Sequence, residues 1–174
     1  RVPTPADLTA VIGENTLVGF GARLRHDTRD SAFLATQGHL IQLEFEQVVG
    51  SFNYPRFDLD MRKYFLLHEP SHGLGGRHVL SVRGRMAVTG RNTPIYERYF
   101  AGGFSTLRGF DFRGASPRVG GVTVGGEFMV LGSVEYLFPI TPGDVIYGVL
   151  FTDFGTVEEV ANIDVDDFRV APGF

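Results

Sequence analysis

The sequence predicts an all-β fold: a partial antiparallel transmembrane β-barrel of about six strands, with one long loop inserted into its lumen. Apolar residues recur with a period of two and helix signals are nearly absent, which indicates strands. The alternating segments run for about 10–13 residues, close to the ~9–11 with which a tilted strand crosses a bilayer. Strands of soluble sheets are shorter, at ~5–6 residues.

Each predicted strand has an apolar face and a polar face, except the last, at about 144–155, whose two faces are both apolar apart from Asp153. In the first, Phe20 and Leu24 share one face, and Arg23 and Arg25 share the other. A soluble β-sandwich or a lipocalin-like binding module would alternate in the same way. Strand length favours the membrane barrel, and the soluble module stays open as the alternative. We place the strands in one barrel domain over 1–174, at about 15–27, 38–48, 55–67, 78–89, 127–138 and 144–155.

Composition excludes several classes of protein. The net charge of −4 and the lack of a long basic stretch argue against nucleic-acid binding. The absence of cysteine excludes disulfides, thiol catalysis and thiolate metal sites. No apolar run reaches the ~18 residues of a transmembrane helix, but alternating strands escape that test.

The predicted connections differ in length. Short turns are expected at 50–53 and 141–143, and long connections at 27–37, 69–76 and 89–126. Outer-membrane barrels have short turns on one rim and long loops on the other. We therefore expect long and short connections to alternate along the chain.

The inner loop at about 90–126 carries the main functional signal. A connection of this length is functional or disordered, and its many aromatic residues argue against disorder. A loop folded into the lumen would bury Arg108, and an unpaired buried guanidinium is unfavourable. Glu135 and Asp153 lie on the next two strands and are candidate partners.

Several ordered segments resemble one known family. The stretch Glu97–Phe110 resembles the sixth-loop motif of the BamA-like outer-membrane assembly superfamily, also called the bacterial surface antigen family. That superfamily includes the two-partner secretion pores, and the resemblance is to its C-terminal barrel. Ser133–Pro139 and Phe151–Val157 match two later strands in order and spacing, and Asp27–Asp30 followed by Gly38 matches an earlier strand connection. Together these segments span about 15–157.

The resemblance implies a lumen arginine with acidic partners. Carried over, Arg108 would be that arginine, and Glu135 and Asp153 would bind it. Gly109 would permit a tight turn and Phe110 would pack on the inner wall. The motif also includes Leu107, where valine is commonest, and the loop-supporting residues Glu97, Gly102 and Gly103.

The resemblance further implies a sixteen-stranded barrel preceded by periplasmic POTRA domains, in the outer membrane of a diderm bacterium or a derived organelle. Its implied partners are outer-membrane lipid, unfolded outer-membrane protein substrates, POTRA domains of the same polypeptide and accessory lipoproteins. The implied activity is insertion or translocation of other outer-membrane proteins, and a dedicated two-partner secretion pore is the alternative. The chain would hold strands eight to thirteen and, at 168–174, the start of a fourteenth, with its edges paired to segments outside it.

No enzyme is predicted, because the sequence contains no nucleophile elbow, zinc motif or serine–histidine pair. His68 and His72 are the only close histidine pair, and a solvated loop is the better interpretation than a metal site. No cofactor is expected, since the glycine-rich stretch 120–126 lacks a phosphate-binding motif.

Overall fold

The computed structural model describes residues 5–70, 76–141, 145–161 and 165–174. It confirms the all-β antiparallel fold class, with one seven-stranded sheet in the order β1-β2-β3-β4-β7-β8-β9. Within the described residues, no helix is long and apolar enough to cross a bilayer. The strands are β1 (Leu17–Asp27), β2 (Gly38–Gly50), β3 (Tyr54–His68), β4 (His78–Thr89), β7 (Phe128–Pro139), β8 (Tyr147–Glu158) and β9 (Arg169–Gly173).

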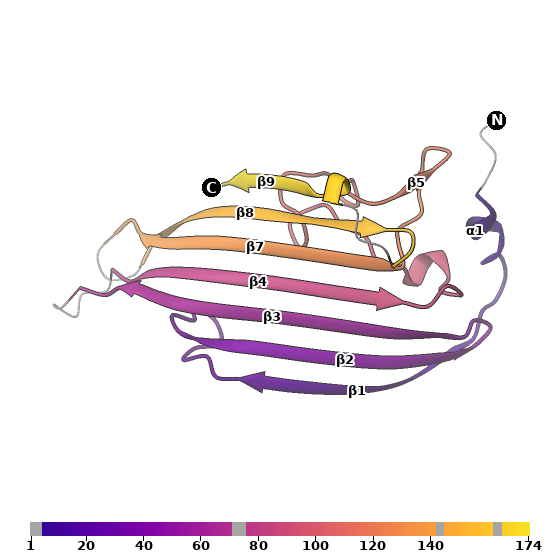
Figure 1. Ribbon diagram of the computed structural model, residues 1–174, viewed down its shortest axis with the longest axis horizontal. Coiled ribbons are helices and arrows are strands. Elements are labelled where there is room, and N and C mark those ends of the chain that lie inside the picture. The colour runs from indigo at the N-terminus through magenta and orange to yellow at the C-terminus, as the bar shows by residue number, and fades with distance from the viewer. Residues whose placement is uncertain (1–4, 71–75, 142–144, 162–164) are drawn as a thin grey trace.

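Sequence neighbours are neighbours in the sheet, and every pairing is antiparallel. Figure 1 shows the strands side by side, with β1 at one edge and β9 at the other. The chain also forms the short helix α1 (Ala6–Thr9) and the 3₁₀ turn η1 (Ile95–Glu97). A small hairpin consists of β5 (Arg118–Val119) and β6 (Val122–Thr123). A second 3₁₀ turn, η2 (Val165–Asp167), precedes β9.

Most strand positions lie close to the expected ranges, and two features differ. The inner loop contains secondary structure, since η1 and the β5–β6 hairpin form within it. The last predicted strand, at about 144–155, is β8 and begins at Tyr147, while residues 142–144 lie outside the described part of the chain. Before Asp153 both faces of this strand are largely apolar, so the alternation does not mark where it begins.

The prediction of one short-turn rim and one long-loop rim is wrong. Because each strand reverses direction, the second and fourth connections lie at the same end of the sheet. They are the short turn 51–53 and the long loop 90–127, and we call this end the loop rim. The far rim carries the connections 28–37, 69–77 and 140–146, which differ much less in length.

The two faces of the sheet are chemically distinct. The inner face, against which the long loop packs, carries cross-strand ion pairs such as Arg23–Glu44 at 2.8 Å and Arg85–Asp58 at 2.6 Å. Apolar side chains fill the outer face and many are exposed, so this face suits contact with lipid. Exposed members include Val18, Phe20, Leu24, Ile41, Phe45, Met61, Phe65, Val82, Met86, Val134, Leu150 and Val170.

Candidate functional site

The long loop packs onto the inner face through an apolar centre. Leu107 is fully buried and lies in a cluster with inner-face residues of β4, β7 and β8, and Phe110 packs against that cluster. The loop supplies small side chains here, which lets its backbone approach the wall closely. The other members are Ala87, Tyr99, Ala101, Ala115, Met129, Leu131 and Val157.

Burial of Leu107 places the next side chain, Arg108, against β8. Its Nε donates to Asp153 Oδ2 at 2.7 Å and its Nη2 to Asp153 Oδ1 at 2.6 Å. The backbone N–H of Arg108 also donates to Asp153 Oδ2, at 3.1 Å. The carboxylate thus receives a bidentate pair and an amide, the strong arrangement for a buried acid.

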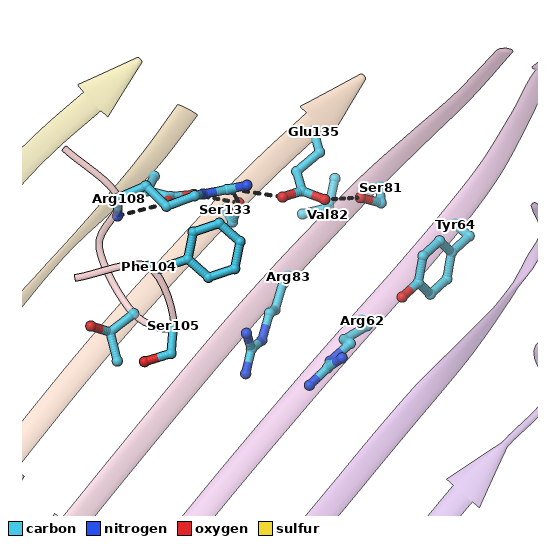
Figure 2. A pocket seen from close by; sticks show the side chains of 12 residues that line it. Arg62, Tyr64, Ser81, Val82, Arg83, Phe104, Ser105, Arg108, Ser133 and Glu135 are labelled. Carbon is cyan, nitrogen blue, oxygen red and sulfur yellow. Dashed lines mark hydrogen bonds and ion pairs between the residues drawn. The ribbon is translucent and has the colours of Figure 1, made fainter. Parts of the chain in front are cut away.

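A second carboxylate approaches the same guanidinium from β7. Glu135 Oε1 lies 2.6 Å from Arg108 Nη2, and Ser81 on β4 donates to the other oxygen at 3.4 Å. Figure 2 shows Arg108 and Glu135 pointing toward one another across the strands. Ser133 lies between the two acids, accepting from Arg108 at 3.1 Å and donating to Asp153 at 2.6 Å.

Burial and charge make this network asymmetric. The Asp153 side chain is only 3% exposed, against 37% for Glu135 and 21% for Arg108. The hydrogen bond to Asp153 is the main cause that raises the pKa of Arg108 above its ordinary value. The guanidinium also lies over the Phe151 ring, 3.6 Å from its centre, a cation–π contact that covers one side of the plane.

A cavity of about 200 Å³ adjoins the network on the inner face. Arg62 and Arg83, side by side on β3 and β4, face it together with Tyr64 (Figure 2). Both arginines bind Asp60, at 3.1 and 2.7 Å. Two cations share one acid there, while Arg108 shares two acids, so the positive and negative excesses lie on opposite sides of the cavity.

Further contacts fix the base of the loop to the wall. Glu97 in η1 accepts from Arg56 Nη1 on β3 at 2.6 Å, and the Arg56 guanidinium lies 5.4 Å from the Tyr99 ring centre. Tyr99 and Gly126 exchange backbone hydrogen bonds of 2.9 and 3.0 Å, which closes the loop at its two ends. Burial raises the pKa of the Glu127 carboxyl, just before β7, with Arg98 and Arg91 opposing that shift.

Glycines of the loop motif hold backbone conformations that other residues rarely adopt. Gly102, Gly103 and Gly109 have φ values of +114°, +96° and +88°. A Cβ on Gly102 would also collide with the carbonyl oxygen of Asp111, so the loop could not turn back on itself here. A Cβ on Gly109 would meet Ala171 of β9 at 3.2 Å.

The structure therefore brings Arg108, Glu135 and Asp153 into one network and places Glu97 at a separate contact with Arg56. Sequence reasoning missed Ser133 and Phe151. Ser133 lies two residues before Glu135, and Phe151 two residues before Asp153, so each shares a strand face with a predicted partner. This spacing is the sequence signal that could have identified them. His72, of the predicted histidine pair, lies outside the described residues.

The long antiparallel strands, apolar outer face and charged inner face closed by an arginine-bearing loop define an outer-membrane β-barrel protein. Residues 10–170 match the family model described as the Omp85 superfamily domain, and the chain belongs to that superfamily. Proteins of this superfamily are outer-membrane proteins of diderm bacteria, which gives the chain its location.

One relative agrees with this assignment, and one solved structure shares the fold. The chain is 30% identical over 162 residues to the outer membrane protein assembly factor BamA of Nitratidesulfovibrio vulgaris, covering 89% of this chain and 20% of that protein. It also resembles the crystal structure of BamA from Haemophilus ducreyi lacking POTRA domains 1–3, with a TM-score of 0.67 and 21% identity over 81% of this chain and 29% of that one. The chain thus spans about a fifth of the length of the curated relative.

Proposed function

We propose that this chain forms barrel wall and lumen loop of a protein that inserts other proteins into the outer membrane. Its similarity to an outer membrane protein assembly factor supports this activity. The mechanism is non-covalent: the barrel offers strand edges to a substrate, which pairs with them by β-augmentation. POTRA domains and accessory lipoproteins are the proposed partners, and unfolded outer-membrane proteins the substrates.

The observation that carries the proposal is the Arg108 network. A loop that is bonded to β7 and β8 and also packed beneath β4 braces three strands at once. In this proposal Arg108 is the lumen lock, Asp153 its main anchor and Glu135 its secondary anchor. The brace keeps the wall rigid while strand pairing proceeds elsewhere in the barrel.

A depletion experiment tests the proposal. Cells whose full-length protein is replaced by the Arg108→Ala variant should lose many different outer-membrane barrels, and Glu135→Gln should give a smaller loss. Arg23→Ala, which removes an equal charge from an exposed inner-face ion pair, is the matched control. Normal levels of all barrels in the Arg108→Ala cells would contradict the proposed role of Arg108 as the lumen lock.

The same experiment separates the alternative, a dedicated secretion pore. A pore predicts that outer-membrane barrels stay at normal levels while one soluble protein fails to leave the cell. Quantitative proteomics of the outer membrane and of the medium distinguishes these two results.

A further inference from the structure

The described histidines share one face and one end of the sheet. His26 follows the outer-face Leu24 by two residues, and His39 precedes the outer-face Ile41 by two. His78 stands two residues before Leu80 on β4 and is paired with His68 across the β3–β4 bulge. All four therefore lie on the outer face near the far rim.

Lys63 joins these histidines. It lies on β3 between the outer-face residues Met61 and Phe65, directly opposite His39 in the register. Its side chain is exposed, and no ion pair joins it to a carboxylate among the described residues. Its ammonium lies 5.6 Å from the Phe65 ring centre. A lone ammonium in hydrocarbon is costly, so this position suits the headgroup level of a bilayer.

Barrel tilt places His26, His39, Lys63 and Tyr136 at a similar depth, with His68 and His78 closer to the far rim. Strands tilted by about 35–45° and spaced ~4.8 Å apart shift the membrane level by about 1–1.5 residues per strand. From His26 to His39 the shift is toward the far rim, and Tyr136 on β7 continues the same line. The strand ends move in the same sense, since β3 and β4 extend past the level at which β1 ends.

The four histidines, Lys63 and Tyr136 form a belt on the outer face, and side-chain contacts join several of its members. His26 Nδ1 and His39 Nε2 share a hydrogen bond of 3.0 Å, and His78 Nδ1 and the Tyr136 hydroxyl share one of 2.7 Å. The His68 and His78 rings meet edge to face, with centres 5.8 Å apart. Imidazole and phenol groups with an apolar body and a polar tip are suited to the membrane interface.

An apolar groove of about 470 Å³ begins at this belt. It is lined by His39 and Ile41 of β2, residues 61–63 of β3 and residues 82–84 of β4. Gly84 opens its floor, because no atom lies within 4 Å of where a Cβ would stand. The groove therefore has a basic end at Lys63 and His39 and an apolar path from Met61 toward Gly84.

We propose that this groove binds one anionic glycerophospholipid, with an acyl chain along Met61 and Gly84 and the phosphate at Lys63. The chemistry of the groove selects the occupant. Its apolar path suits a hydrocarbon chain. On the outer face of the described strands, Lys63 is the only lysine or arginine, so it is the group that attracts an anionic headgroup. The inference requires that the outer face meets lipid, and it does not depend on insertion activity.

Native mass spectrometry of the full-length protein in detergent tests the site. Phosphatidylglycerol or phosphatidylcholine is added, and the fraction of protein that retains one lipid is measured. Lys63→Gln should lower phosphatidylglycerol affinity about fivefold, from the loss of one interfacial charge. Gly84→Leu should weaken binding of both lipids by filling the groove, and the open space around Gly84 means that the variant still folds.

Two control variants separate the site from general charge effects. Lys63→Arg keeps the charge and should keep the affinity. Arg25→Gln removes a cation from the inner face of β1 and should leave lipid binding unchanged. Equal binding of the two lipids by the wild type, or wild-type affinity in both Lys63→Gln and Gly84→Leu, would overturn the proposal.

Discussion

Arg108→Ala is the substitution that most sharply separates a buried anchor from a surface ion pair. It would leave the Asp153 carboxylate, 3% exposed, with the Ser133 hydroxyl as its remaining side-chain donor. Removing one partner of a buried ion pair destabilises by about 3–5 kcal/mol. Because Arg108 is 21% exposed and Ser133 stays, we expect about 2–3 kcal/mol for the loop contact.

Hydrogen exchange measures this loss directly. A decrease of about 2–3 kcal/mol in local opening energy corresponds to about 30- to 150-fold faster exchange of loop amides. The relevant amides are those at 101–115 that bond within the loop, such as Gly103 to Phe110 and Ala115 to Ala101. Peptides from β2 and β3 should exchange at unchanged rates, because the network does not reach them.

Arg23→Ala is the matched control for this measurement. The Arg23 and Glu44 side chains are 59% and 41% exposed, and an exposed pair contributes about 0–1 kcal/mol. In the Arg23→Ala variant, the loop peptides should exchange at the wild-type rate. Equal protection of the loop in the Arg108→Ala and wild-type proteins would show that this ion pair does not hold the loop on the wall.

Three further predictions concern the loop and the wall. Gly102→Ala should lower the melting temperature far more than Gly121→Ala, since both positions have positive φ but only Gly102 is closely packed; equal shifts would contradict this. Burial raises the pKa of Glu127, so its contribution to stability is present below the ordinary glutamate value and lost as pH rises through the folded value. Glu127→Gln should therefore flatten the melting temperature between pH 4 and 8, and an unchanged slope would count against burial as the cause. Single cysteines at 134 and 135 should react with lipid-soluble and water-soluble maleimides respectively, and the reverse pattern would invert the two faces.

The fold could be predicted because the period-two pattern fixes which face of each strand is apolar. Where one face is charged, as around Arg23 and Arg25, the predicted and observed strands nearly coincide. β8 was displaced by about three residues because its residues before Asp153 are apolar on both faces. Short elements such as the β5–β6 hairpin depend on one local pairing, which alternation does not reveal.

The candidate site was predictable in part, for electrostatic reasons. A buried guanidinium requires carboxylates, and the sequence offers Glu135 and Asp153 on the strands that follow the loop. Ser133 and Phe151 carry no charge, so nothing in their type drew attention to them. Only the geometry shows that Phe151 covers the guanidinium plane and that Ser133 bridges Arg108 and Asp153.

The asymmetry of the rims illustrates a different limit. The rim on which a connection lies depends on the chain direction of the strands it joins, not on the length of the connection. Counting connections places 51–53 and 90–127 at the same end, as Figure 1 shows at the end that carries η1. Topology, rather than residue type, decides which connections share a rim.

The proposed function requires the Arg108 brace for insertion of other barrels. Its most direct test is folding of an outer-membrane barrel substrate into liposomes that contain the purified full-length protein, with wild type and Arg108→Ala present at equal amounts. We expect Arg108→Ala to slow substrate folding at least about tenfold, and Arg23→Ala to support folding at the wild-type rate. Wild-type folding rates with Arg108→Ala, in a sample whose loop exchanges rapidly, would contradict it.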